Sequence, residues 1–170
     1  MTRYRPPQPK GSKFITKSGW QRLKDELDYL WKVKRPQVTQ AVSEAAAQGD
    51  RSENAEYIYG KKQLREIDSR VRFLRQRLDG MVIVNQVPSD LSRVFFGAWV
   101  TLEDEAGVEL EYRIVGPDEF DATQKLISMD SPLAKALFKK TLDDEISIEV
   151  PGGKKSYVIV AISYRDFETV

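Results

Sequence analysis

Residues 49–57 read GDRSENAEY, and the segments on both sides of this stretch carry the apolar pattern of a coiled coil. Before it, apolar residues recur at alternating steps of three and four at Trp20, Leu23, Leu27 and Leu30, and the stripe resumes after a gap at Val38, Ala41 and Ala45. The same steps follow it, at Leu64, Ile67, Val71, Leu74 and Leu78. This spacing predicts two long helices that pack along a narrow apolar seam.

The two helices are predicted to fold back on each other as an antiparallel pair. Leu27 then faces Leu74 and Ala41 faces Gly60, because the numbers of facing residues add up to about 101 when the chain reverses at residues 50–51. Pro36 lies inside the first helix, where it removes one hydrogen bond. Since the apolar pattern continues beyond it, we expect one helix with a kink near residues 32–36.

The composition excludes several kinds of chemistry. Of the 170 residues, 41% are hydrophobic and 31% are charged, which provides for one modest core besides the helical pair. The chain has neither cysteine nor histidine, so disulfides, thiolate zinc sites and histidine-dependent nucleophilic catalysis are excluded. It shows no signal peptide and no apolar run of about 18 residues, and we therefore expect a cytoplasmic protein that does not contact membranes.

Charge is distributed unevenly along the chain, although the net charge is only +1. Residues 1–16 have four basic and no acidic side chains, residues 17–80 have fourteen and ten, and residues 81–170 have nine and sixteen. The N-terminal part is therefore expected to attract a polyanion and the C-terminal part to repel one. Residues 1–13 contain three prolines and no apolar pattern, which predicts a disordered basic tail.

Beyond Leu78 the pattern changes to that of strands. Gly80 suits the end of a helix, and short strands are predicted at residues 81–84 and 125–129. Residues 94–103 with 108–115, and 146–150 with 157–164, predict two hairpins. Ser131 and Pro132 suit the cap and first position of a short helix up to residue 140. The chain is thus predicted to be α+β, with an antiparallel coiled coil at 14–80 and an α+β domain with an antiparallel sheet at 81–170.

Asp50 and Glu53 are the only candidates for chemistry that the pattern indicates. Three residues apart at the expected start of a helix, they can converge on one side of its first turn and provide half of a Mg²⁺ site. The same spacing is that of a capping box, in which both carboxylates bind backbone N–H groups. Spacing alone favours the cap, and the two interpretations remain open at this point.

Basic residues of the second helix form a further candidate site. Lys61, Lys62 and Arg65 lie off the apolar seam at helical spacing, as a cluster that holds a phosphate backbone would. A solvated face with ion pairs to Glu66 and Asp68 is the alternative, and the pattern favours that alternative.

Four strings carry a resemblance to a known family. GDRSENAEY at 49–57, YIYGKKQLREIDSRVRFL at 57–74, FFGAWV at 95–100 and DSPLAKAL at 130–137 resemble the bacterial transcript cleavage factors of the Gre family, GreB type. The likeness spans residues 14–164. It implies that the coiled coil enters the secondary channel of RNA polymerase and that the C-terminal domain is FKBP-like and docks on the polymerase.

The resemblance also implies roles for individual residues. The catalytic, metal-binding pair of the family falls on Asp50 and Glu53, and its RNA-contacting patch falls on Lys61, Lys62 and Arg65. Its docking loop falls on residues 130–132, Asp130, Ser131 and Pro132. A protein of this kind is expected to be a monomer that shares a Mg²⁺ with the polymerase at the 3′ end of backtracked RNA. It lends carboxylates to the polymerase and is not itself an enzyme.

Two other classes of function remain open from the sequence. The first is a factor of the same fold that enters the secondary channel and inhibits the polymerase without stimulating RNA cleavage. An isomerase or chaperone built on the FKBP-like domain would need an apolar pocket, for which the sequence shows no signature.

Overall fold

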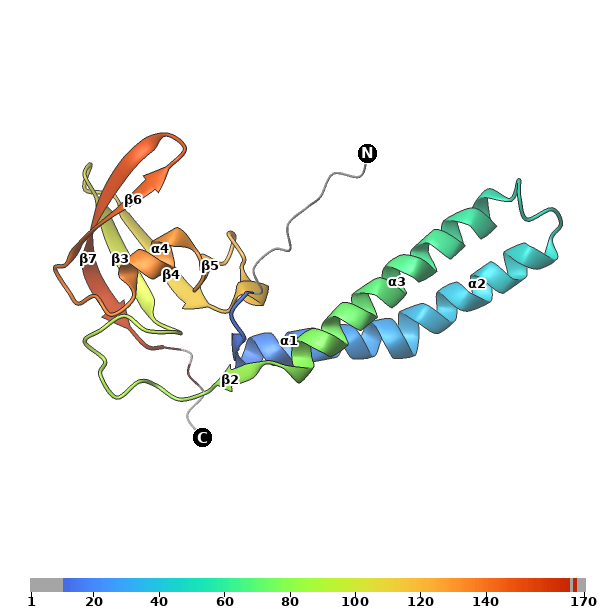
Figure 1. Cartoon of the computed structure of the whole chain (residues 1–170), viewed down its shortest axis with the longest axis horizontal. Coiled ribbons are helices and arrows are strands. Elements are labelled where there is room, and N and C mark those ends of the chain that lie inside the picture. Colours follow the sequence, from blue (N-terminus) through green and yellow to red (C-terminus); the bar gives the residue numbers. More distant parts are fainter. Residues whose placement is uncertain (1–10, 166, 168–170) are drawn as a thin grey trace, which may run out of the picture. The chain divides into compact units, whose positions relative to one another are not determined.

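The computed structural model of the chain describes residues 11–165 and 167, which form two compact units. One unit, residues 18–81, is a helical hairpin, and the other joins residues 11–17 to the described residues from 82 onward around a β-sheet (Figure 1). The architecture is α+β, as predicted. Most of the predicted tail, residues 1–10, lies outside the described residues.

The hairpin consists of two helical arms, and its buried residues confirm the predicted seam. The first arm contains α1 (Lys17–Tyr29), a π-helical turn η1 (Leu30–Lys34) and α2 (Arg35–Ala47); the second is α3 (Ala55–Asp79), beside α2 (Figure 1). Gly80 is the C-cap of α3, as expected. Buried apolar side chains follow both arms, at Leu23, Leu27, Val38, Val42, Ala45, Ile67, Val71 and Leu74.

The π-helical turn lies directly before Pro36, where a kink was expected. Arg35 donates its N–H to the carbonyl of Leu30, five residues back, so the turn holds one residue more than an α-helical turn. Pro36 has no N–H to donate and its ring crowds the preceding turn, and the wider turn gives that ring room. The helix therefore continues through Pro36 with a local change of hydrogen bonding.

The extra residue also corrects one predicted pair. Val42 is buried opposite Gly60, whereas Ala41 is exposed. A Cβ on Gly60 would lie 2.4 Å from Cγ2 of Val42, so the arms meet most closely where Gly60 has no side chain. The prediction that Ala41 faces Gly60 was wrong, because the π turn rotates the following residues around the helix axis.

The sheet has five strands in the order β5-β4-β3-β7-β6. Its strands are β3 (Trp99–Asp104), β4 (Glu109–Val115), β5 (Leu126–Ser128), β6 (Glu145–Val150) and β7 (Gly153–Ser163). The two predicted hairpins, β3–β4 and β6–β7, are both antiparallel. β5 pairs with β4 in parallel, which the prediction of an antiparallel sheet missed. Parallel pairing needs a crossover, and residues 116–125 provide it with the 3₁₀ turn η2 (Pro117–Glu119).

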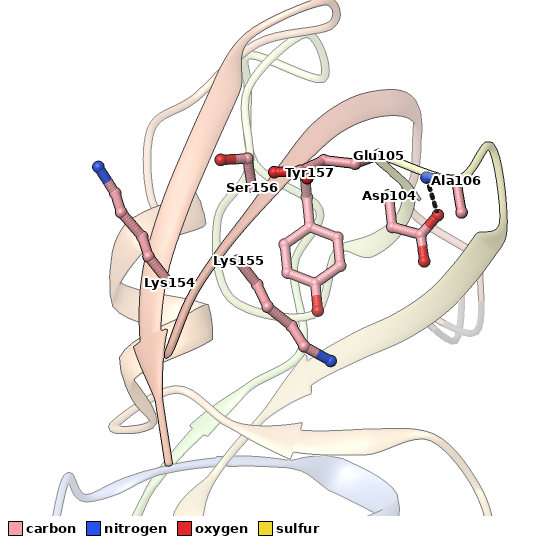
Figure 2. A pocket seen from close by; sticks show the side chains of 7 residues that line it. All are labelled: Asp104, Glu105, Ala106, Lys154, Lys155, Ser156 and Tyr157. Carbon is pink, nitrogen blue, oxygen red and sulfur yellow. Dashed lines mark hydrogen bonds between the residues drawn. The ribbon is translucent and has the colours of Figure 1, made fainter. Parts of the chain in front are cut away.

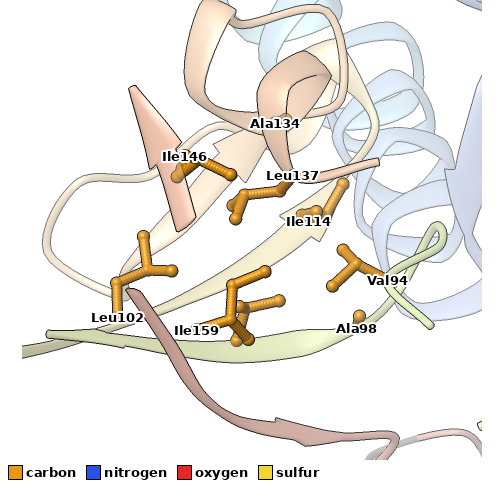
Figure 3. Close-up of a cluster of buried hydrophobic side chains, with 9 residues drawn as sticks. Val94, Ala98, Leu102, Ile114, Ala134, Leu137, Ile146 and Ile159 are labelled. Atoms are coloured by element: carbon orange, nitrogen blue, oxygen red, sulfur yellow. The ribbon is translucent and has the colours of Figure 1, made fainter. Parts of the chain in front are cut away.

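The core of this unit lies between the sheet and the short helix α4 (Pro132–Leu137). Leu137 and Ala134 of α4 point toward sheet residues such as Leu102, Ile114 and Ile159 (Figure 3). Leu102, Leu137 and Ile159 are completely buried. Burial of a side chain of this size contributes about 1.5–3 kcal/mol, so α4 is held by packing despite its length.

A second, two-stranded sheet was only half predicted. β2 (Val82–Val84) is the expected strand after Gly80, and its parallel partner is β1 (Phe14–Thr16), which the sequence did not suggest. Glu119 is buried and accepts hydrogen bonds from the Thr16 N–H, at 3.0 Å, and from the Thr16 hydroxyl. Gly116 also donates its N–H to Glu119, at 2.9 Å. β1 is thereby attached to η2 as well as to β2.

Candidate functional site

The turn between the two arms, residues 48–54, is closed by Asn54. Its side-chain oxygen accepts the N–H of Tyr57 at 3.1 Å, which makes it the N-cap of α3. Its amide nitrogen donates to the carbonyl of Ala45 at 2.8 Å, at the end of α2. Asn54 therefore connects the end of one arm to the start of the other.

This cap corrects the capping-box interpretation of Asp50 and Glu53. Because α3 begins at Ala55, both carboxylates lie in the turn and not in the first turn of a helix. Asparagine satisfies the first N–H groups of α3 without a charge, so neither carboxylate is needed there. The prediction was wrong because Asn54 competes with Asp50 for the same role, and spacing does not decide between them.

Asp50 is exposed, and Ser52 fixes its orientation. The hydroxyl and the N–H of Ser52 both donate to Oδ1 of Asp50, at 2.7 and 2.9 Å. These two bonds hold the pKa of the Asp50 carboxyl below its usual range, and the bond from the Ser52 hydroxyl has the larger effect. Asp50 is thus ionised at neutral pH, and Oδ2 has no hydrogen-bond partner within the described chain.

Glu53 is the second exposed carboxylate of the turn. Neither a hydrogen bond nor an ion pair engages it among residues 11–165. Nor do those residues contain any group of three or more His, Cys, Asp or Glu side chains that would hold a metal ion. Asp50 and Glu53 therefore form, at most, part of a metal site that another molecule completes.

Lys61, Lys62 and Arg65 are all exposed on α3. Lys62 lies 4.0 Å from a carboxylate oxygen of Glu66, both side chains being about two-thirds exposed, which makes this a weak pair. Asp68, the other expected partner, instead pairs with Arg35 across the seam at 2.7 Å. The predicted ion-paired face is thus only partly formed, and this cluster keeps most of its positive charge available.

Sequence reasoning missed a cation–π cluster around Trp31, a residue of the π turn. Trp31 is 43% exposed, and the guanidinium groups of Arg35 and Arg75 both lie near its ring, with Cζ atoms 5.2 and 4.4 Å from the ring centre. Such cation–π contacts contribute about 0.5–1 kcal/mol each at exposed sites. Arg35 and Arg75 are therefore engaged within the hairpin, unlike Lys61.

The predicted docking residues lie on the loop between β5 and α4. Ser131 caps α4, accepting the N–H of Ala134 at 3.2 Å, and Pro132 is the first residue of the helix, as expected. Asp130 is half-buried and binds Ser12, which donates its N–H to Oδ2 at 2.8 Å and its hydroxyl to Oδ1. No periodic pattern points to Ser12, because the contact spans 118 positions.

A pocket of about 200 Å³ lies between the β3–β4 turn and the β6–β7 hairpin (Figure 2). Charged and polar residues line most of it, including Asp104, Glu105, Lys154 and Lys155. Asp104 accepts the N–H groups of Ala106 and Val108, both at 2.9 Å, and so serves the turn. Ligand pockets are typically about 300–1,000 Å³, so this smaller hollow does not favour an isomerase.

Two protein-family models match nearly the whole chain. The N-terminal model for GreA/GreB transcription elongation factors matches residues 13–83, and the C-terminal GreA/GreB model matches residues 88–164. The chain belongs to the GreA/GreB family of transcription elongation factors. Within residues 11–165, the structure contains no helix long and apolar enough to cross a membrane.

Individual members of the family are similar over most of their length. Transcription elongation factor GreB of Pseudomonas aeruginosa is 62% identical over 164 residues, which are 96% of this chain and 98% of that protein. GreB of Pasteurella multocida is 63% identical over 154 residues, 91% of this chain and 98% of that protein. The solved structure of GreA factor homolog 1 (Gfh1) of Thermus thermophilus is 27% identical and covers 88% of this chain and 97% of its own, with a TM-score of 0.41.

These identities make the chain a GreB-type member of the GreA/GreB family. It is a transcription elongation factor rather than an enzyme in its own right. The candidate site in its helical turn therefore has to be understood as a contribution to transcription elongation.

Proposed function

We propose that this GreA/GreB-family factor enters the secondary channel of bacterial RNA polymerase as a monomer and stimulates the polymerase to cleave backtracked RNA. Cleavage releases arrested complexes, because it creates a new RNA 3′ end in the active site. The turn carries the proposal: Asp50 and Glu53 are exposed carboxylates between two long helices, and Asn54 leaves both free of capping. Within the described chain, neither Oδ2 of Asp50 nor the Glu53 carboxylate accepts a hydrogen bond, so both keep lone pairs for another ligand.

The donor set of the turn fits Mg²⁺. This ion prefers oxygen ligands and commonly takes one or two protein carboxylates, with water and substrate phosphate in its remaining positions. Asp50 is ionised and keeps Oδ2 available, and Glu53 is exposed. When bound, Mg²⁺ supplies positive charge next to the phosphate under attack. The polymerase and its RNA would complete the site.

The chain's own residues would divide the remaining tasks. Glu53 or Asp50 would accept a hydrogen bond from the attacking water and so orient it. Lys61, Lys62 and Arg65 would hold RNA phosphates near the 3′ end, since exposed basic side chains bind a phosphate backbone without reading its sequence. The loop at residues 130–132 would dock on the polymerase surface and hold the factor in place.

The test uses stalled elongation complexes with a backtracked RNA 3′ end, Mg²⁺ and saturating factor, with RNA length as the readout. Asp50→Asn and Glu53→Gln should reduce the cleavage rate on the order of 10²-fold or more, because a charge that stabilises the transition state is lost. High Mg²⁺ should restore part of the rate. Both variants should fold like the parent, since Asn54 and not these carboxylates caps α3.

Glu44→Gln is the matched control. Glu44 is an exposed carboxylate on α2, close in sequence to the turn, and it binds only Gln40 in the described structure, at 2.9 Å. This change removes the same charge from the same hairpin and should leave cleavage unchanged. If Asp50→Asn and Glu53→Gln cleave at the parental rate while still binding polymerase, the factor is a channel-binding protein without a role in the chemistry.

A further inference from the structure

Tyr59, one turn into α3, is the most exposed large hydrophobic side chain of the described residues, at 67%. Its neighbour Gly60 is buried against Val42. Successive helical residues point about 100° apart, so Tyr59 faces away from the seam between the arms. Among residues 11–165, no hydrogen bond, ring contact or cation engages its side chain. The ring is therefore accessible to another molecule.

Other aromatic side chains of the hairpin are already engaged. Tyr57 is half-buried, and Cζ of Arg51 lies 6.0 Å from its ring centre. The exposed rings of Trp31 and Phe73 also have guanidinium groups near them, with Cζ at 4.4 and 5.2 Å from the ring centres. A guanidinium over a ring occupies a face that a nucleobase would use for stacking. Tyr59, close to the turn, has no such neighbour within the described chain.

Tyr59 lies between side chains of opposite charge. Before it are the carboxylates of the turn and Glu56, in the first turn of α3. After it comes the basic cluster of Lys61, Lys62 and Arg65, and Lys62 is its neighbour on the helix surface, three residues on. Within the described chain, neither Lys61 nor Arg65 has an ion pair, and Lys62 has only a weak one. A neutral ring thus separates the proposed metal-binding turn from a surface that attracts phosphates.

We propose that Tyr59 stacks on an unpaired base of the extruded RNA and so makes the factor prefer backtracked complexes. This inference rests on the proposed function, in which the basic cluster holds RNA phosphates. Proteins typically bind single-stranded nucleic acid with basic groups along the backbone and aromatic rings on the bases, which is the combination found here. The positive charge beside Tyr59 favours RNA over an uncharged protein surface as its partner. Every base has a π face, so the contact does not select an RNA sequence.

The experiment measures the dissociation constant of fluorescently labelled factor for two elongation complexes, by anisotropy and with Mg²⁺ omitted so that the RNA stays intact. One complex is backtracked and has extruded RNA; the other has none. Tyr59→Ala should weaken binding to the backtracked complex about five- to tenfold and leave binding to the other unchanged. Tyr59→Phe keeps the ring and should bind both like the parent. Tyr59→Ala should also fold like the parent, because alanine favours helix at an exposed position.

An abasic nucleotide in the extruded RNA makes the test specific for stacking. It removes the base and keeps the phosphate, so the parental factor should lose the same five- to tenfold in affinity. Tyr59→Ala should lose nothing more on the abasic RNA, since both changes remove one contact. If the abasic nucleotide weakens Tyr59→Ala as much as it weakens the parent, Tyr59 does not stack on the base and the inference is overturned.

Tyr29→Ala is the matched control, because Tyr29 is a 52% exposed tyrosine of the same hairpin, at the end of α1. It should bind both complexes like the parent. If Tyr59→Ala weakens binding to both complexes equally, Tyr59 contacts protein in the channel and not RNA, which overturns the inference. Parental binding by Tyr59→Ala overturns it as well. Cleavage by the parental factor after Mg²⁺ is added tests the proposed function separately, so the inference can fail while that function stands.

Discussion

Asp50 and Asn54, four positions apart in one turn, have different roles. Asn54 binds backbone groups of both arms, whereas Asp50 binds only Ser52 within the described chain and remains exposed. An amide both donates and accepts, so it can connect two helix ends; a carboxylate only accepts. Asn54, which connects the two helix ends, is therefore distinct from Asp50 and Glu53, the residues proposed to take part in RNA cleavage.

Ser52→Ala tests how the turn controls the charge of Asp50. Loss of the hydroxyl bond should raise the pKa of Asp50 toward its usual value, measured by NMR titration of the carboxyl group. Because the folded pKa lies below the unfolded one, the Ser52 bonds favour the folded turn above the ordinary pKa of aspartate. Their contribution is lost as the pH falls through the lowered pKa. At neutral pH Asp50 stays ionised in both proteins.

Asp90 provides the control for that titration. Ser92 binds it as Ser52 binds Asp50, and its pKa is lowered mainly by the Ser92 hydroxyl. Ser92→Ala should raise the pKa of Asp90 and leave that of Asp50 unchanged. A Ser52→Ala protein in which Asp50 titrates as in the parent would show that the hydroxyl does not stabilise the ionised form.

At the scale of elements, the hairpin depends on how closely its arms approach at Gly60. Glycine inside a helix is less favourable than alanine by about 0.5–1 kcal/mol, so its presence here needs a reason. Val42 provides it: the branched side chain occupies the space that a Cβ on Gly60 would need. The π turn before Pro36 sets which residue of α2 takes that position.

Gly60→Ala should therefore destabilise the hairpin, even though alanine favours helix. A Cβ 2.4 Å from Cγ2 of Val42 forces the stiff valine or the backbone to move, which we expect to cost about 1–3 kcal/mol. Unfolding followed by circular dichroism measures the effect. Val42→Ala removes the clashing methyl, so the double variant should be less destabilised than the two single changes together.

Gly152→Ala is the control for the Gly60→Ala measurement, because no atom lies within 4 Å of a Cβ at position 152. It should change stability by less than about 0.5 kcal/mol. Parental stability in Gly60→Ala would mean that the arms are further apart at this point than the structure places them.

At the scale of the whole molecule, the proposed chemistry and the proposed docking belong to separate units. Asp50 and Glu53 lie in the unit at residues 18–81, and Asp130 lies in the sheet unit. The sheet unit is discontinuous in sequence, since β1 before the hairpin pairs with β2 after it. The chain thus leaves the sheet unit after β1 and returns to it at β2.

A double variant tests this division of tasks. Asp130→Ala should raise the factor concentration for half-maximal cleavage about tenfold or more, because an oriented charge leaves the interface, while the saturated rate stays almost intact. Asp50→Asn should lower only the saturated rate. In the combined variant the two effects should add, since the residues share no partner. A lower saturated rate with Asp130→Ala alone would contradict separate tasks.

Local signals in the sequence determined most of the elements. The hairpin could be predicted because its seam repeats every three or four residues, and the β3–β4 and β6–β7 hairpins because their strands flank turn residues. The start of α4 at Ser131 and Pro132 could also be predicted, because serine is a common helix cap and proline suits the first helical position. The exposed positions of Asp50 and Glu53 follow from the fold-back point, which the sequence located within the turn.

Tertiary structure decided the features that depend on distant partners. Strand β1 is three residues long and has no pattern of its own; it exists because β2 and Glu119 satisfy its backbone. The parallel pairing of β5 depends in the same way on β4. Ser12 and Asp130 meet across 118 positions, and Thr16 and Glu119 across 103. Sequence periodicity shows only which residues share a face of one helix or strand. Contacts between residues this far apart in the chain therefore cannot be predicted from it.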